Sequence, residues 1–423
     1  MYWLYGRGWD QNDWAVQQFP DKTKLDSLFP DRPVYLKRID GHAALANQKA
    51  LDIAGINLQS TIAGGIVEQK NGQLTGMLID NAMNLLEKHI PPISDSLAAL
   101  YFQQTQKECF AYGLTGVHDC GITEEMVDLI QKEQAAGRLH MKIYALLTDI
   151  PAYYDRWIKK GPLKTALLHV GGFKWYADGA LGSRGACLIR DYHDQPGWRG
   201  FMLSDSSYFQ ALAQKLIASH LQVCTHAIGD SGNREMLRIY ASVLQRDNDR
   251  RWRIEHAQVV NPADMGYFRQ YHIIPSVQPT HATSDMYWAE ERLGPERMPQ
   301  AYAYQHLLQT NGWMPLGTDF PVEYINPFAT FFSAVYRQDA KGFPAGGFQM
   351  ADALSKEQAL RGMTIWAAKA AFEEKEKGSL EPGKAADFVL LDRNILTCRP
   401  DSILQTKVNA TYINGKKVFG LSH

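Results

Sequence analysis

The sequence is poor in cysteine and has no pairing pattern among its cysteines. Five are scattered over 423 residues, and none forms a C-x-x-C motif. A disulfide framework or a structural zinc knuckle is therefore not expected, and a reducing compartment, the cytoplasm, is the better expectation. The first residues, MYWLYGRGWD, lack the charged segment and apolar core of a signal peptide.

Long apolar runs and concentrations of one charge are also missing. No apolar stretch approaches the roughly 18–20 residues that cross a bilayer. The formal net charge is −1, and no segment concentrates Lys or Arg. These absences argue against a membrane protein and against a nucleic-acid-binding surface. Apolar residues make up 45% and charged residues 21% of the chain, the composition of a globular protein with a sizeable core.

From about residue 113, short apolar runs alternate with longer helical stretches. This alternation is typical of βα units around a parallel sheet. The predicted strands are 115–120, 142–148, 172–178, 222–228, 251–258, 273–278 and 312–319. The predicted helices are 96–112, 123–136, 205–219, 231–246, 261–270 and 298–310. Seven such strands predict an α/β fold, a (β/α)8 TIM-type barrel with one strand unaccounted for.

The two ends of the chain depart from this rhythm. Residues 1–95 hold strand-like pieces at 33–39 and 65–69, a helix near 43–54 and an Asn71-Gly72 turn, which predict an α+β insertion over the barrel mouth. Near the C-terminus, a strand at 387–392 and a hairpin of 408–413 and 416–419 predict a small β module. The expected units are therefore 1–95, 96–377 and 378–423. The chain opens like the middle of a strand, so we expect further sequence upstream.

Residues of the metal-ligand type recur at or near the C-terminal ends of the predicted strands. Lys174, His226, His256 and Asp319 each lie on a different strand. Catalytic groups of barrel enzymes gather at that face. A single histidine there could equally cap a loop, but two on adjacent strands, with Lys and Asp on others, favour a divalent-metal site.

Lys174 has more than one interpretation. An ammonium group cannot bind a cation, so Lys174 is a ligand only if carbon dioxide converts it to a carbamate. Alternatively, it pairs with a carboxylate such as Asp178, or forms a Schiff base in a barrel lyase. Lys174 taken alone favours the ion pair.

Several longer segments resemble the amidohydrolase family of the YtcJ type, which includes N-substituted formamide deformylases. They are GRGWDQNDW (6–14), RPVYLKRIDGHAALANQKALDIAGI (32–56), FKWYADGALGSRGA (173–186), HAIGD (226–230), EHAQ (255–258), QPTHATSD (278–285), ERLGPER (291–297) and GTDFPVE (317–323). The segment KGSLEPGKAADFVLLDRN (377–394) resembles the closing β-sandwich strands of the wider superfamily. The resemblance covers essentially the whole chain.

The resemblance implies a two-metal site for hydrolysis of a C–N bond in an amide-type small molecule. Carboxylated Lys174, His226, His256 and Asp319 would hold one or two divalent ions, with zinc expected, and Asp319 would move the proton. Family members also carry an H-x-H pair on barrel strand 1, and this sequence has no H-x-H. We therefore expect an N-terminally truncated barrel, open between strands 8 and 2, with one weakened metal position. The alternative is a catalytically impaired homologue that only binds a ligand.

Substrate contacts are expected from residues in the family-like segments. The candidates are Trp9, Arg38, Asp40, His42, Asp178, Arg184, His281 and Arg292. Each has a structural alternative: Arg184 could form a salt bridge, and Trp9 could belong to the core. A small amide is the expected partner, with neither nucleic acid nor membrane, and a homodimer is left open.

Overall fold

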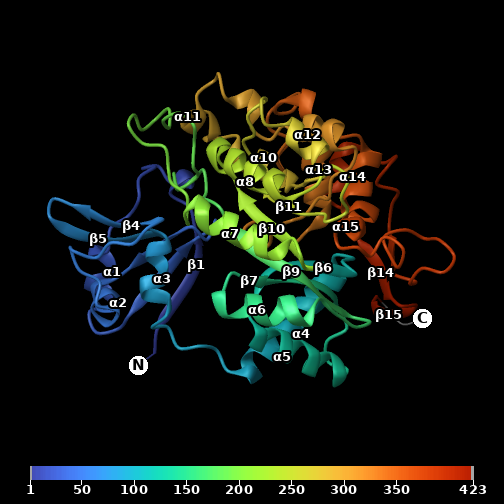
Figure 1. Cartoon of the computed structure of the whole chain (residues 1–423), viewed down its shortest axis with the longest axis horizontal. Coiled ribbons are helices and arrows are strands. Elements are labelled where there is room, and N and C mark those ends of the chain that lie inside the picture. The colour runs from blue at the N-terminus through green and yellow to red at the C-terminus, as the bar shows by residue number, and fades with distance from the viewer. Residues whose placement is uncertain (1, 421–423) are drawn as a thin grey trace.

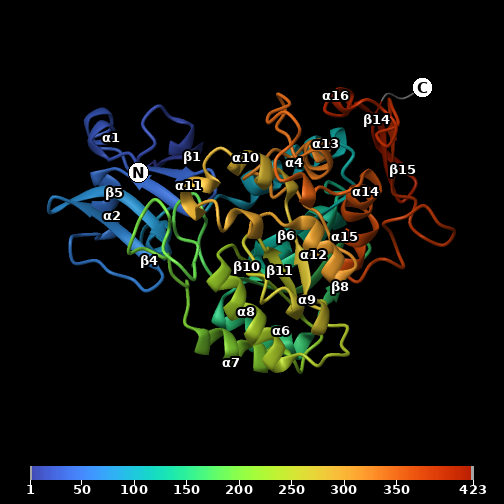
Figure 2. The ribbon, with the colours of Figure 1, turned by 90° about the horizontal axis from the view of Figure 1, so that it is seen from above.

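Strands within residues 2–420, the part of the chain that the computed structural model describes, form three sheets. Figures 1 and 2 show the five-stranded sheet (blue) at one end of the molecule and the three-stranded sheet (red) at the other, with the curled parallel sheet between them. Residue 1 of the predicted first unit and residues 421–423 of the predicted last unit lie outside the described part. The division of the chain into three domains stays a prediction.

The N-terminal sheet has the strand order β1-β2-β3-β5-β4. Its strands are β1 (Leu4–Trp9), β2 (Val34–Arg38), β3 (Ala43–Ala46), β4 (Gly65–Lys70) and β5 (Gln73–Asp80). The helical pieces around it are η1 (Gln11–Asp13), α1 (Thr23–Leu28), α2 (Gln48–Ala54) and α3 (Asn81–Glu87). Asn71 and Gly72 have φ values of 52° and 72°, so the predicted turn between β4 and β5 is confirmed.

The predicted helix near 43–54 is wrong in its first part. Residues 43–46 form β3, which pairs with β2 on one side and β5 on the other. All four residues of β3 are buried, so sheet pairing and burial outweigh the helix preference of an alanine-rich segment. The helix begins only at Gln48, where the side chain of Asn47 accepts a hydrogen bond from the N–H of Ala50.

Both faces of this small sheet are covered by apolar residues. Leu78 packs with Ala44 in the cluster that includes residues of α2 and α3. Its neighbours Met77 and Ile79 face the opposite cluster, which includes Trp9. Successive strand residues point to opposite faces, so β3 and β5 are held firmly from both sides. Side chains at the ends of these strands therefore have a well-defined place.

The central sheet confirms an α/β fold with a curled parallel sheet. Its parallel strands run in the order β6-β7-β9-β10-β11-β12, and β8 pairs with β9 in the antiparallel sense. The strands are β6 (Gly116–Ile122), β7 (Lys142–Thr148), β8 (Leu163–Lys164), β9 (Leu168–Tyr176), β10 (Gln222–Ala227), β11 (Arg253–His256) and β12 (Ile274–Ser276).

The predicted strand at 312–319 is wrong as a regular strand. In the described part of the chain it contributes only an isolated parallel bridge between Val277 and Leu316. Pro315 lies next to the bridge and has no N–H to donate, which limits how far the ladder can extend. The sheet is a half-barrel, and the complete barrel with one missing strand stays a prediction.

Helices precede, connect and follow the strands of the parallel sheet, and those that begin at Pro279 or later come after its last strand, β12. They are α4 (Asp95–Ala111), α5 (Glu124–Ala135), α6 (Pro151–Lys160), α7 (Ser206–Leu216), α8 (Asp230–Val243), α9 (Gly266–Gln270), α10 (Pro279–Asp285), α11 (Ala289–Leu293), α12 (Tyr304–Asn311), α13 (Pro327–Tyr336), α14 (Lys356–Met363) and α15 (Ile365–Ala370), with the 3-10 turns η2 (Met298–Gln300) and η3 (Met350–Asp352). The predicted helix at 298–310 is divided into η2 and α12, because Tyr302 between them has a φ of 55°.

The C-terminal sheet is antiparallel, in the order β13-β14-β15. Its elements are β13 (Phe388–Leu391), α16 (Pro400–Ile403), β14 (Val408–Ile413) and β15 (Lys416–Phe419). The hairpin is therefore where it was predicted, whereas a composite β-sandwich stays a prediction. Among the described helices, none combines the length and the apolar character needed to cross a bilayer.

Candidate metal centre and its cavity

A cavity of about 1660 Å³ includes the C-terminal ends of the parallel strands, with the N-terminal subdomain as one wall, and extends to the start of β6 and to β13. The barrel wall contributes ligand-type residues from several strands and loops: Lys174, His226, His256, His281 and Asp319. The subdomain wall contributes a set of charged residues: Arg38, Asp40, His42 and Asp80. The four residues predicted as metal ligands thus share one cavity with four of the eight residues predicted as substrate contacts.

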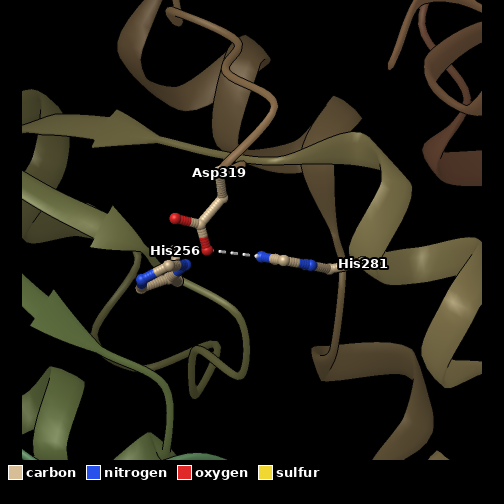
Figure 3. Close-up of side chains that lie close together, drawn as sticks. All are labelled: His256, His281 and Asp319. Carbon is tan, nitrogen blue, oxygen red and sulfur yellow. Dashed lines mark hydrogen bonds and ion pairs between the residues drawn. The ribbon is translucent and has the colours of Figure 1, made fainter. Parts of the chain in front are cut away.

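Three side chains in this cavity lie within reach of a single ion. One ligand atom each from His256, His281 and Asp319 lies within 4.8 Å of the others. Figure 3 shows these three side chains close together. The ring nitrogen Nε2 of His281 is 3.2 Å from Oδ2 of Asp319. Two imidazoles and a carboxylate are a suitable donor set for zinc and similar divalent ions. The residues present therefore fit a metal ion, and His281, predicted as a substrate contact, belongs to this cluster.

Left-handed backbone geometry helps to bring two of these residues together. His256 has a φ of 73° and Asp319 a φ of 59°, values that are unfavourable for non-glycine residues. In a regular strand, Glu255 and His256 would point to opposite faces of the sheet. Both line the cavity, because β11 ends at His256 and its backbone turns there. Sequence alternation alone does not reveal this turn.

Glu323 holds the ring of His281 in place. Its Oε1 lies 3.1 Å from Nδ1 of His281 and accepts a hydrogen bond of 2.6 Å from the hydroxyl of Ser284. A carboxylate on one ring nitrogen is the common way in which proteins orient a metal-binding histidine. Glu323 was not among the predicted site residues, although it ends the GTDFPVE segment.

His226 presents its other nitrogen to the cavity. Its Nε2 is 3.3 Å from the carbonyl oxygen of Gly179, which can only accept, so Nε2 carries the proton and Nδ1 keeps its lone pair. Its ring centroid lies 4.6 Å from that of His256. Burial, together with the charge of nearby groups such as Lys174, lowers the pKa of His226 well below its usual value. The ring is therefore neutral, as a metal ligand must be.

Lys174 lies deep in the barrel wall without a carboxylate in contact. It is 3% exposed, and its Nζ lies 4.5 Å from the ring centroid of Tyr176. Among the described residues, no hydrogen bond or ion pair engages that amine. The expected partner, Asp178, instead accepts hydrogen bonds from three backbone N–H groups, those of Cys187, Ile228 and Gly229. The structure therefore lacks the ion pair that the lysine alone had suggested.

The pKa values in the cluster favour an ionised Asp319 and a neutral His256, the forms in which these two side chains can bind a metal ion. Burial alone would raise the pKa of Asp319, but the hydrogen bond from His281 and the proximity of His256 hold it at about 2. Burial lowers the pKa of His256 to about 3. Burial would also lower the pKa of His281, but Asp319 and Glu323 raise it well above its usual value. His281 must therefore release a proton before it can bind a metal ion.

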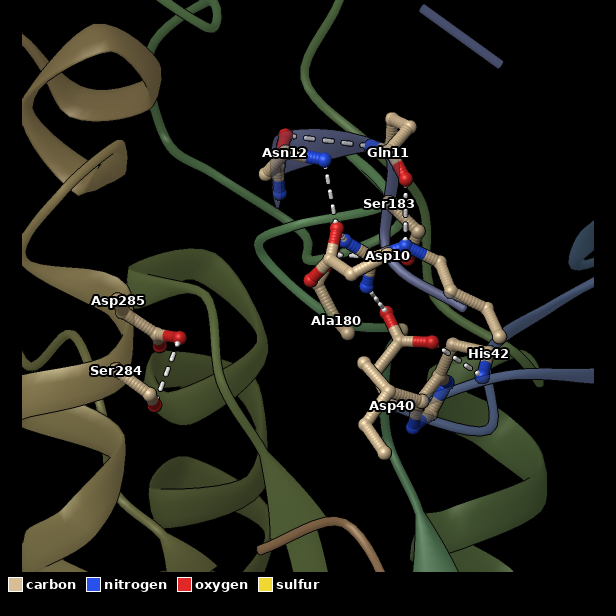
Figure 4. Close-up of polar contacts among 12 residues, drawn as sticks. Asp10, Gln11, Asn12, Asp40, His42, Ala180, Ser183, Ser284 and Asp285 are labelled. Atoms are coloured by element: carbon tan, nitrogen blue, oxygen red, sulfur yellow. Dashed lines mark hydrogen bonds and ion pairs between the residues drawn. The ribbon is translucent and has the colours of Figure 1, made fainter. Parts of the chain in front are cut away.

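The charged residues of the subdomain wall neutralise one another. The guanidinium of Arg38 contacts the carboxylates of Asp10 and Asp40, and its Nε donates a hydrogen bond of 2.8 Å to Gln11. Asp40 also accepts a 3.0 Å hydrogen bond from the backbone N–H of His42. Figure 4 shows this network. The Arg38 guanidinium therefore has no free pair of N–H groups with which to bind a substrate carboxylate.

The other predicted substrate contacts do not line the cavity. Arg184 forms an ion pair with Asp194, and Arg292 binds the same carboxylate. Asp178 is fully buried by the backbone contacts described above. Trp9 donates to the carbonyl of Leu36 and belongs to the subdomain core. These four side chains lie around the cavity without lining it. Their place in family-like motifs did not distinguish such supporting residues from residues that contact the substrate.

Comparisons with known proteins agree with this arrangement. The model of the amidohydrolase family matches residues 1–419. The putative amidohydrolase YtcJ of Bacillus subtilis is 31% identical over 424 residues, 99% of this chain and 80% of that protein. The N-substituted formamide deformylase of Arthrobacter pascens is 25% identical over 441 residues, 98% of this chain and 78% of that protein.

A solved structure shares the fold over nearly the whole chain. It is an uncharacterized metal-dependent hydrolase from Pyrococcus horikoshii, with a TM-score of 0.74 and 25% identity, covering 94% of this chain and 78% of that one. The family suggested by the sequence motifs is confirmed by the match at residues 1–419. The chain belongs to the amidohydrolase family.

Proposed function

We propose that the protein is a divalent-metal-dependent hydrolase that cleaves a C–N bond in an amide or N-substituted formamide. The observation that carries the proposal is the convergence of His256, His281 and Asp319 within one ion's reach. The similarity to an N-substituted formamide deformylase supports the choice of bond. Zinc is the proposed ion because imidazole nitrogens dominate the donor set.

The residues of the barrel wall would hold the ion and handle the proton. His256, His281 and Asp319 would supply direct ligands together with His226, and Lys174 would join them only as a carbamate. A bound divalent ion polarises a carbonyl group and makes a water molecule more acidic. Asp319, which is ionised, partly exposed and lines the cavity, would accept the proton of the attacking water and pass it to the leaving nitrogen.

The test combines metal content with turnover of a simple chromogenic amide. Protein from zinc-supplemented cells is assayed for metal by mass spectrometry and for release of 4-nitroaniline from 4-nitroformanilide and 4-nitroacetanilide. We expect bound zinc and zinc-dependent release, and we expect His226→Ala and His256→Ala to lose metal. Asp319→Asn should lower kcat by about 10²–10⁴-fold with the fold intact.

The control for Asp319→Asn is Asp247→Asn, an exposed aspartate outside the cavity. It should retain wild-type turnover. A loss of only about tenfold in Asp319→Asn would contradict the proton-transfer role. Absence of both bound metal and turnover in the wild type would overturn the proposed function.

A further inference from the structure

His42 and Asp80 form a hydrogen-bonded pair on the subdomain wall of the cavity. His42 directly precedes β3 and Asp80 ends β5, two antiparallel neighbours in the sheet. The backbone N–H of Asp80 donates to the carbonyl of His42 over 2.9 Å. The Oδ1 atom of Asp80 lies 2.7 Å from Nδ1 of the His42 ring. The pair is therefore fixed by both its backbone and its side chains.

The barrel leaves room for the Asp80 carboxylate by using glycine at two positions. A Cβ atom on Gly179 or Gly185 would lie 2.4 Å or 2.3 Å from Oδ2 of Asp80. The Asp80 side chain is fully buried, and its φ of 50° is unfavourable for a non-glycine residue. The backbone strain and this close approach both serve to hold one carboxylate beside one imidazole.

The pairing leaves a free acceptor nitrogen at the cavity. An ionised carboxylate can only accept, so Nδ1 of His42 donates to Asp80, and in the neutral ring Nε2 keeps its lone pair. Burial alone would lower the pKa of His42, but Asp80 and Asp40 raise it, so the acceptor form is the one present above that raised pKa. Nε2 makes no hydrogen bond to a described residue, and the His42 ring lines the cavity. The ring centroid of His42 is 4.7 Å from that of His226. The free acceptor therefore lies beside the candidate metal centre.

We propose that Nε2 of His42 binds the substrate by accepting a hydrogen bond from the N–H of the scissile amide. Asp80 is then a positioning residue that fixes the ring tautomer. This inference rests on the proposed function and narrows its substrates to amides with an N–H, such as N-monosubstituted formamides. A tertiary amide would fill the cavity yet leave this acceptor without a hydrogen-bond donor, which lowers binding about 10–100-fold.

The tautomer can be measured without metal or turnover. Long-range ¹H–¹⁵N spectra of histidine-labelled, metal-free protein at about pH 8 report which ring nitrogen carries the proton, and His42→Phe identifies the His42 signals by difference. We expect a protonated Nδ1 and a bare Nε2. In Asp80→Asn, the amide group can donate to Nδ1, so the proton should move to Nε2. A wild-type ring protonated at Nε2 would overturn the proposal.

Turnover tests the recognition of the N–H. The wild type should hydrolyse 4-nitroformanilide about 10–100-fold better in kcat/KM than its N-methyl derivative. Asp80→Asn and His42→Phe should lose this preference while they retain bound zinc. The matched control is Asp52→Asn, on α2 of the same subdomain, which should keep the preference.

The possible outcomes separate the two proposals. If Asp80→Asn keeps the preference within about twofold, the inference on His42 fails while the hydrolase function stands. If the wild type hydrolyses neither compound, the proposed function fails for these amides. Titration of the metal-free protein with 4-nitroformanilide then decides the inference: a shift of the His42 Nε2 resonance supports it, and an unchanged resonance overturns it.

Discussion

On the subdomain wall of the cavity, Arg38 is buried between Asp10 and Asp40, whereas on the barrel wall Lys174 is buried with no carboxylate in ion-pair contact among the described residues. Burying a charge without a partner is costly, so a protein retains such a group only where something else requires it. The buried cation of the subdomain wall therefore has its counter-charges in place, whereas the buried cation of the barrel wall has none among the described residues.

Each wall of the cavity has a histidine whose ring is held by a carboxylate, but the two histidines differ in what their second nitrogen faces. His42 is held by Asp80 at 2.7 Å and His281 by Glu323 at 3.1 Å, in both cases through Nδ1. The second nitrogen of His281 faces Asp319, whereas that of His42 faces the cavity with no described partner. A histidine held by a carboxylate can thus bind a metal ion or a substrate, depending on which group its Nε2 contacts.

Substitution of the two buried cations should give the largest difference between the two walls, measured as a change in the free energy of unfolding. Arg38→Met leaves Asp10 and Asp40 buried without a counter-charge, so we expect a loss of about 3–5 kcal/mol of unfolding free energy. Lys174→Met removes a buried charge that has no ion-pair partner, so the unfolding free energy should stay equal or rise, while metal binding is lost. Urea denaturation followed by circular dichroism measures both. Equal destabilisation by the two substitutions would remove the distinction between the walls.

The two carboxylate–histidine pairs should differ in their effect on metal affinity. Glu323→Gln loosens the orientation of His281 and should weaken zinc binding about 10–100-fold. Asp80→Asn lies on the subdomain wall and should change zinc affinity by less than about twofold. Competition with a chromogenic chelator measures each affinity. Weaker binding in Asp80→Asn than in Glu323→Gln would reverse the proposed roles.

The smallest expected effect concerns carboxyl groups on the two sides of the cavity. Burial raises the pKa of Asp285 on the barrel side to about 7. Burial would also raise that of Asp40, but the Arg38 guanidinium holds it below its usual value. Between about pH 4 and pH 7, folded Asp285 binds a proton that the unfolded chain has released. The unfolding free energy therefore falls as pH rises, by on the order of 1 kcal/mol for each pH unit in this window.

Asp285→Asn should reduce this pH dependence. Urea midpoints at about pH 5 and pH 8 give the slope for the wild type and the variant, and their difference isolates Asp285 from other buried carboxyl groups. The hydroxyl of Tyr302, 2.8 Å from Asp285, can still donate to the asparagine oxygen, so packing is preserved. An unchanged slope would place the pKa of Asp285 in its usual range.

Much of the secondary structure and part of the site could be predicted from local sequence patterns. The strand at 142–148 and the hairpin strands at 408–413 and 416–419 have the predicted bounds, because short apolar runs and an Asn-Gly turn specify them locally. A shared site was also predicted for Lys174, His226, His256 and Asp319, because the C-terminal ends of parallel strands converge.

The remaining features depend on contacts between elements that are far apart in the chain. The alanine-rich residues 43–46 became a strand because two neighbouring strands pair with them, and residues 312–319 did not become one beside Pro315. Glu323 and Asp80 joined the site through His281 and His42, which lie 42 and 38 positions away in the chain. Side-chain periodicity is a local property that a sequence displays directly. Contacts between separate elements depend on how those elements pack, which no single segment encodes.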